Sequence, residues 1–85
     1  MTTYRFRVVI SHHVESEEEI LDLADRLAAV GCDDGHLGGH VEGIEMVFDR
    51  EAESRDEAMR SAVQQIEQCG LAVKRIELDR EAIAA

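Results

Sequence analysis

The stretch from Gly31 to Gly43 reads GCDDGHLGGHVEG and separates two similar halves of the chain. On each side of it, a segment of alternating apolar and polar residues is followed by a segment with apolar residues at helical spacing. Each helical segment begins with the pattern Glu-Ser-x-x-Glu, at positions 15–19 and again at positions 53–57. In such a pattern the serine caps the first turn and the second glutamate completes a capping box. The sequence therefore predicts a strand and a helix on each side of a glycine-rich middle.

Strand alternation and glycine positions predict the remaining elements. The expected strands cover residues 4–11, 32–41, 44–49 and 71–78, with a turn at 42–43 and helices that run from the serine caps to Gly31 and Gly70. The glycine-rich second strand packs few side chains and is expected at an edge. The alternation slips within the last strand, which predicts a bulge near Lys74 and Arg75.

The order βαββαβ is typical of the ferredoxin-like α+β sandwich. We expect one domain over residues 1–85, with a four-stranded antiparallel sheet in the order 4-1-3-2 and both helices on one face. Residues 79–85 are expected to form a short helical turn or to fray.

Composition restricts the function. The net charge of -10, from 19 acidic and 9 basic residues, repels polyanions, so no direct binding of nucleic acid is expected. It suits solubility, a basic protein partner or a cation. No apolar run approaches membrane-spanning length, no secretory signal opens the chain, and two cysteines are too few for a disulfide scaffold. A reduced, cytoplasmic protein is the expectation.

The uncovered face of the predicted sheet is the first candidate site. The residues expected there alternate with the core residues of the first and third strands: Arg5, Arg7, Val9, Glu45, Val47 and Asp49. Two valines within a charged rim suggest a contact surface for a second copy or a protein partner. We expect the charges of this face to form ion pairs across strands rather than to bind RNA. We expect self-association through this face rather than through the glycine-rich edge, because opposite charges can pair across a two-fold axis.

The second candidate is a metal site built from Cys32, His36 and His40, whose even spacing puts them on one side of a strand. Zinc or nickel accepts such ligands, although the spacing matches no established metal motif and an exposed polar edge strand is the simpler explanation. Asp33 and Asp34 point to opposite faces, so we expect them to make local turn hydrogen bonds. No phosphate-binding loop, nucleophile elbow or asparagine occurs, so no catalytic residue is predicted and the chain is not expected to be an enzyme.

A longer pattern covers about half of the chain. It runs GCDD, a strand, a turn and a strand ending in F-D-R-E-A, followed by S-x-x-E-A and a helix. Its residues here are Gly31, Cys32, Asp33, Asp34, Phe48, Asp49, Arg50, Glu51, Ala52, Ser54, Glu57, Ala58, Ser61, Ala62 and Val63. This pattern resembles a group of small bacterial domains that usually precede a helix-turn-helix segment in DNA-binding or antitoxin-like proteins. The resemblance implies the fold more than a function, and no helix-turn-helix segment follows in residues 1–85.

These observations together favour a non-enzymatic, self-associating or partner-binding module in a bacterial antitoxin-like or transcription-associated system. The alternative is a regulatory domain that binds a metal or a small ligand.

Overall fold

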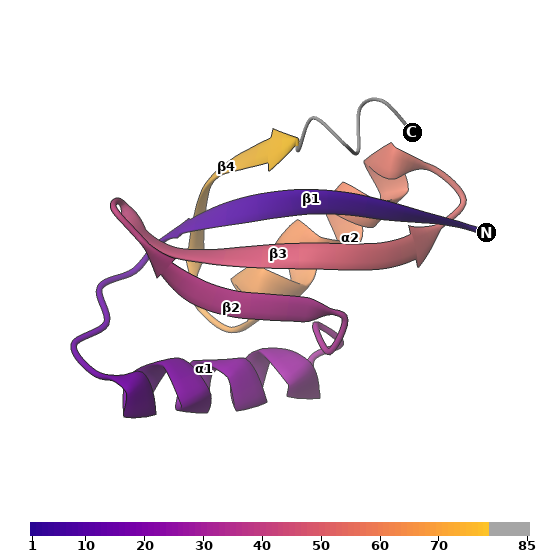
Figure 1. The fold of residues 1–85 in the computed structure, drawn as a ribbon. Helices are drawn as coiled ribbons and strands as arrows, with labels where there is room; N and C mark the ends of the chain where they lie inside the picture. Colours follow the sequence, from indigo (N-terminus) through magenta and orange to yellow (C-terminus); the bar gives the residue numbers. More distant parts are fainter. Residues whose placement is uncertain (79–85) are drawn as a thin grey trace.

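The elements follow the order β-α-β-β-α-β in the computed structural model, which describes residues 1–78 (Figure 1). They are β1 (Thr2–Ser11), α1 (Glu17–Ala29), β2 (Gly35–His40), β3 (Gly43–Ala52), α2 (Arg55–Gln68) and β4 (Ala72–Leu78). The strands form one antiparallel sheet in the order β2-β3-β1-β4, so the predicted ferredoxin-like α+β fold is confirmed and β2 and β4 are its edges. The expectation for residues 79–85 lies outside the described residues. Neither described helix has the length and apolar character needed to cross a membrane.

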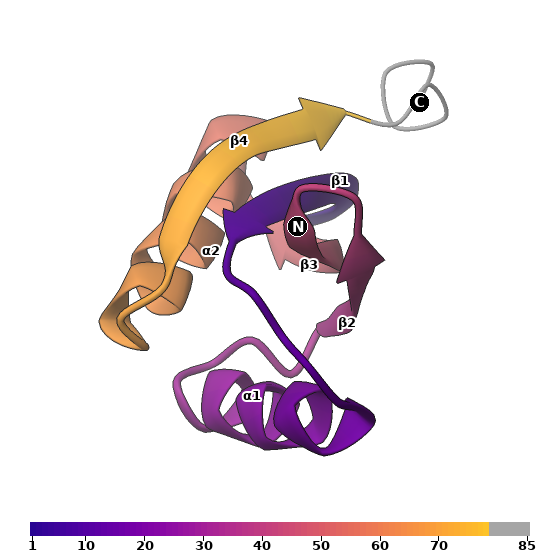
Figure 2. The same cartoon turned by 90° about the vertical axis from the view of Figure 1, so that its left-hand side faces the viewer.

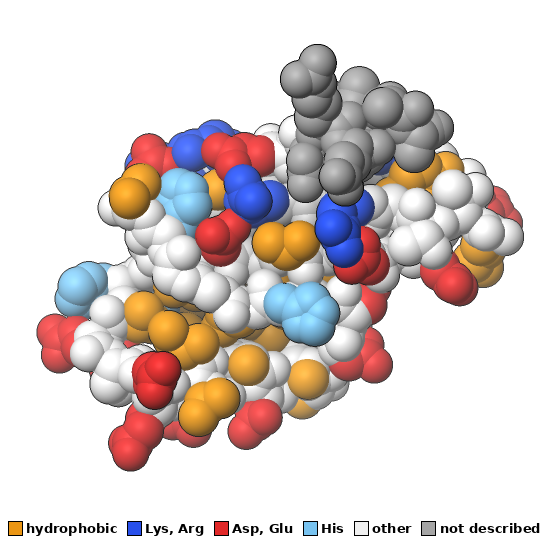
Figure 3. All heavy atoms as spheres, in the orientation of Figure 1, with side chains coloured by type: hydrophobic (Ala, Val, Ile, Leu, Met, Phe, Trp, Pro, Cys, Tyr) orange, Lys and Arg blue, Asp and Glu red, His pale blue; other side chains and the backbone are white. Residues whose placement is uncertain are grey.

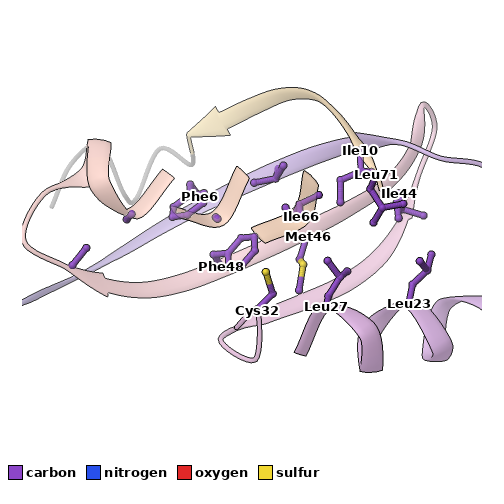
Figure 4. Packing of buried hydrophobic residues seen from close by; sticks show 14 residues of the cluster. Phe6, Ile10, Leu23, Leu27, Cys32, Ile44, Met46, Phe48, Ile66 and Leu71 are labelled. Atoms are coloured by element: carbon purple, nitrogen blue, oxygen red, sulfur yellow. The ribbon is translucent and has the colours of Figure 1, made fainter. Parts of the chain in front are cut away.

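Both helices pack on the same side of the sheet, α1 next to β2 and α2 next to β4, β3 and β1 (Figure 2). The alternation in β1 and β3 directs one set of side chains toward the helices, as predicted. Phe6 and Phe48 stack there with their ring centroids 5.2 Å apart. Around these rings the core contains mostly aliphatic side chains from β1, α1, β3, α2 and the connecting loops, while β2 and β4 add only partly buried side chains (Figure 4). Its fully or nearly fully buried members are Phe6, Val8, Ile10, Leu23, Leu27, Cys32, Ile44, Met46, Phe48, Ala52, Ala58, Ala62, Ile66 and Leu71.

Serine caps start both helices, as the repeated pattern predicts. The Ser16 hydroxyl accepts a hydrogen bond from the backbone N–H of Glu19 at 3.3 Å. The Ser54 hydroxyl accepts one from the N–H of Glu57 at 3.1 Å. Glu19 also reaches back, but its carboxylate accepts from the N–H of Glu15, one residue before the cap, at 3.3 Å. Each cap of this kind contributes about 0.5–2 kcal/mol to helix stability.

The glycine-rich middle differs in detail from the prediction. Strand β2 begins at Gly35 rather than at residue 32, because residues 32–34 form a turn. The hairpin loop is Val41–Glu42, and Gly43 already belongs to β3. Gly43 has a φ of 142°, and a Cβ atom there would lie 2.4 Å from the carbonyl oxygen of Ile10. Only glycine fits this close approach of the hairpin to β1.

The predicted bulge in β4 is confirmed. Val9 pairs with Arg75 and Ile10 pairs with Val73, so Lys74 is the extra residue between the two pairs. The bulge moves the later residues of β4 by one position, and Ile76 thereby comes opposite Val8 on the helix side. It also leaves Arg75 on the uncovered face of the sheet.

Candidate interaction surface

The uncovered face of the sheet carries all six residues that the alternation placed there. In the register of β1 and β3, Arg5 lies opposite Asp49, Arg7 lies opposite Val47, and Val9 lies opposite Glu45. Strand β4 adds Arg75 opposite Val9 and Glu77 opposite Arg7.

The charges on this face pair with one another across strands, as expected. Arg5 binds Asp49 with both ends of its guanidinium, Nε to Oδ1 at 2.8 Å and Nη2 to Oδ2 at 3.0 Å. Hydrogen bonding from Arg5 lowers the pKa of the Asp49 carboxyl. Arg7 lies between Glu45, with Nε to Oε2 at 2.5 Å, and Glu77, with Nη1 to Oε1 at 3.3 Å.

A second group of ion pairs is centred on Arg75. Its Nε contacts Oε2 of Glu77 at 2.9 Å, and its Nη1 contacts the carboxylate of Glu42 in the hairpin loop. Lys74 also approaches Glu42, with Nζ 3.6 Å from Oε1. Hydrogen bonds from Arg75 lower the pKa of both glutamates. We call the complete set the open-face ion network: Arg5, Arg7, Glu42, Glu45, Asp49, Lys74, Arg75 and Glu77.

Val9 is not the exposed apolar centre that we expected on this face. Its exposed fraction is 0%, although it lies outside the core cluster beneath the helices. Its direct neighbours across the strands are Glu45 and Arg75, both members of the ion network. Long charged side chains cover apolar surface with their hydrocarbon stems. Val47 is only half-buried, so the two valines do not form a shared contact patch.

The proposed metal ligands do not come together. Cys32 is 1% exposed in the core, where its Sγ donates a hydrogen bond to Gln65 Oε1 at 3.5 Å and burial raises the pKa of the thiol. His36 is exposed on the uncovered face, opposite Val47. The Nδ1 atom of His40 accepts a hydrogen bond from the backbone N–H of Glu42 at 3.1 Å. Among residues 1–78, no three His, Cys, Asp or Glu side chains gather in a way that could hold a metal ion.

Arg50, which sequence reasoning did not single out, is the one buried charged residue among residues 1–78, with an exposed fraction of 6%. Its Nε and Nη2 atoms donate to the two carboxylate oxygens of Asp34, both at 2.8 Å. Nη1 donates to the Ser61 hydroxyl at 2.9 Å, Nη2 donates to the Gly31 carbonyl at 3.1 Å, and the guanidinium lies 4.9 Å from the centre of the Phe48 ring. Hydrogen bonding to Asp34 raises the pKa of Arg50. Asp34 therefore makes a long-range ion pair in place of the local turn bonds that we expected.

This Arg50 cluster, formed by Gly31, Asp34, Phe48, Arg50 and Ser61, joins the end of α1, the start of β2, β3 and α2. All five residues belong to the pattern that carries the resemblance. The GCDD and DREA segments thus contact each other through the ion pair of Asp34 and Arg50, which holds several elements together. The sequence contained one signal for it, because Arg50 has the same strand parity as Phe48 and must therefore point toward the helices. A cation on that side requires an acidic partner.

The edge strand β2 leaves backbone groups directed outward. Within the described chain it pairs with β3 alone. The N–H of Asp49 donates to the carbonyl of Asp34 at 3.1 Å, so even-numbered positions bond toward β3. Because bonding alternates along an antiparallel pair, the backbone N–H and C=O groups of Leu37 and Gly39 point away from the sheet.

Exposed apolar side chains lie directly beside this edge. A groove of about 330 Å³ between α1 and β2 is lined by Glu17, Ile20, Leu21, Leu37 and Gly38, and we call it the α1/β2 groove. Figure 3 shows it as a strip of hydrophobic side chains between the two elements, with acidic side chains along the outer side of α1. Leu21 is 65% exposed. The sequence signal was that Leu21 lies outside the four-residue spacing of Leu23 and Leu27, the two buried leucines of α1.

No protein-family model, curated protein or solved structure matches this chain.

Proposed function

We propose that this chain is a non-enzymatic protein-interaction module, and that its binding surface is the β2 edge with the α1/β2 groove. The observation that supports the proposal is that outward-directed backbone groups and an exposed apolar side chain occur at the same place. Outward-directed backbone groups of Leu37 and Gly39 lie next to the exposed side chain of Leu21. Open strand edges bind further strands through the backbone, and adjacent apolar pockets select their side chains.

The uncovered sheet face is the less suitable surface. Its charged groups already have partners within the chain, and Val9 is buried beneath them. A partner that docked there would have to break or cover these ion pairs, which costs desolvation energy without releasing much apolar area from water. We therefore assign interaction to the edge instead of the face that the sequence suggested.

The biological setting that we propose is a bacterial antitoxin-like or transcription-associated system. The resemblance of the GCDD and DREA segments to domains found in such proteins supports this setting. The negative charge favours contact with a protein partner over direct contact with nucleic acid.

Affinity purification from the native host, with quantitative mass spectrometry, tests the proposal. The bait is the full chain in three forms: wild type, Leu21→Ser, and Val41→Ser as the control, because Val41 is 99% exposed in the hairpin loop and lies outside the groove. We expect a partner that is enriched with wild type and the control and depleted with Leu21→Ser. The purified partner should then bind the purified chain with a Kd below about 10 μM, the range in which contacts of useful strength fall. Identical captures by all three baits, or a capture that fails to reconstitute from purified components, would refute the assignment.

A further inference from the structure

We infer that the α1/β2 groove and the β2 edge bind an extended, basic segment of a partner protein, which adds to the sheet as a fifth strand beside β2. This inference rests on the proposed function and specifies the chemistry of the partner. Three properties of the site carry it: the backbone of β2, the apolar lining of the groove and the charge along α1.

The backbone of β2 is accessible to another chain. A Cβ atom added at Gly38 or Gly39 would have no described atom within 4 Å. The side chains of a strand stand above and below the sheet, so those at positions 38 and 39 would determine how much room the side chains of a neighbouring strand have. The two glycines leave that space open, next to the outward-directed N–H and C=O groups of Leu37 and Gly39.

The groove provides positions for alternate side chains of the added strand. Side chains of a strand point to opposite faces in turn, so every second residue of the partner would lie on the helix side. There it would meet Ile20 and Leu21 of α1 together with Leu37 of β2. These contacts require apolar residues at alternate positions of the partner segment.

The charge beside the groove selects a basic partner. Glu17, Glu18 and Asp25 lie four residues before, three before and four after Leu21, so they share its side of the helix. Within residues 1–78 none of these three carboxylates forms an ion pair. Arg26, the single basic residue of α1, donates from Nη2 to the carbonyl of Cys69 at 3.1 Å, at the end of α2.

A second copy of the chain is a poor occupant for the same reason. A symmetric pairing of two β2 edges would bring two α1 helices toward each other, each with acidic residues beside the groove. Two chains that each carry a net charge of -10 also repel at long range. Lysine or arginine between the apolar residues of a different protein relieves this repulsion and steers the encounter.

The groove between α2 and β4 lacks this selectivity. It is lined by Met59, Val63 and Ile76, but its rim carries both signs of charge. Its Arg60 already pairs with Asp56 one turn away, with Nε to Oδ2 at 3.0 Å. Nothing there favours a partner of one charge, so the inference concerns β2 alone.

The test uses a fluorescein-labelled synthetic peptide of about nine residues, long enough to span β2, with valine at alternate positions and lysine or threonine between them. Binding to the full chain is followed by fluorescence anisotropy. A second peptide has the same composition with its valines grouped, which keeps the charge and removes the alternation. Two further peptides carry N-methyl groups on the two alternate sets of backbone amides.

We expect the alternating peptide to bind at least about tenfold more tightly than the grouped one. Grouped valines point to both faces of a strand in turn, so only some of them can enter the groove. Only one of the two N-methylated peptides should bind, since a strand directs every second amide toward its neighbour. Gly39→Pro and Leu21→Ser should each weaken binding by about three- to tenfold, and Val41→Ser should leave it unchanged. If circular dichroism shows that Gly39→Pro does not fold, the N-methylated pair still decides the backbone contribution.

Equal binding of the alternating and grouped peptides, or of both methylated peptides, would overturn the inference and leave only non-specific attraction by an acidic protein. If no peptide binds while the host partner is still lost with Leu21→Ser, the partner class is wrong and the proposed function stands. If neither the peptide nor a host partner depends on Leu21, both fail.

Discussion

The uncovered sheet face and the β2 edge both face solvent, but they differ in whether their charged, backbone and apolar groups already have partners within the described chain. On the face, each arginine of the ion network bonds to carboxylates of the same chain, and Val9 beneath them has no exposed area. At the edge, Leu21 remains 65% exposed and the backbone of Leu37 and Gly39 points outward. Charges that already pair within the molecule, as on this face, give a partner little to bind.

Substitution of the two valines of the uncovered face should change the free energy of unfolding by very different amounts. Val9→Glu should destabilise the fold by about 3–5 kcal/mol, because it introduces a carboxylate at a position with no exposed area between existing ion pairs. Val47→Glu, on the same face but half-buried opposite Arg7, should cost less than about 1 kcal/mol. Urea denaturation of both variants measures the difference. Similar small costs for both would mean that the face is as open as the sequence suggested.

The next effect concerns the Arg50 cluster, which anchors the start of β2. Asp34→Ala should cost about 3 kcal/mol, because it leaves the Arg50 guanidinium buried without its carboxylate partner. Asp33→Ala is the matched control: it removes the neighbouring exposed carboxylate, and its effect should stay within about 0.5 kcal/mol. Thermal and urea unfolding of the two variants provide the comparison. Equal stability would show that the buried pair does not anchor β2.

Acid should weaken the ion network of the uncovered face. The pKa values of Glu42, Asp49 and Glu77 are lower in the folded chain than in the unfolded one, because arginines donate hydrogen bonds to these carboxylates. Their stabilisation is therefore present above the unfolded pKa of about 4 and is lost as the pH falls through the lower folded values.

Urea midpoints measured between about pH 6 and pH 2.5 check this loss, and Arg75→Gln should flatten the profile because Arg75 bonds to two of the three carboxylates. An unchanged profile for Arg75→Gln would contradict the role of the network.

The smallest effect on stability should come from the edge. Leu21→Ser removes a side chain that is mostly exposed, so its free energy of unfolding should stay within about 0.5 kcal/mol of the wild-type value. Leu27→Ser, six residues further along α1 and fully buried, is the comparison and should be severely destabilised. A large cost for Leu21→Ser would assign this side chain to folding and remove the reason to assign it to binding.

Local signals predicted most of the fold. The serine caps at Ser16 and Ser54, the glycines that follow each helix and the strict alternation around Phe6 and Phe48 all act within a few residues. Even the bulge at Lys74 was visible as a slip in the apolar alternation. Element order then leads to the sheet order, because the βαββαβ arrangement restricts how the strands can pair.

The proposed interaction surface could not be predicted in the same way, because it depends on contacts between distant residues. Strand parity correctly placed Val9 on the uncovered face, but its burial depends on Glu45 and Arg75, which come beside it only through the register of two strand pairs. Cys32 and His36 were expected on one strand, and the turn at residues 32–34 separated them. Asp34 found its partner 16 residues away in Arg50.

We propose that the chain binds through the β2 edge and not through the uncovered face. Amide chemical shifts of the full, isotope-labelled chain, recorded as the alternating basic peptide is added, distinguish the two surfaces. We expect the largest shift changes at Leu21, Leu37 and Gly39, while the amides of Arg5, Arg7 and Val47 change little. The largest changes at Arg5, Arg7 and Val47, with Leu37 and Gly39 unchanged, would refute binding at the edge.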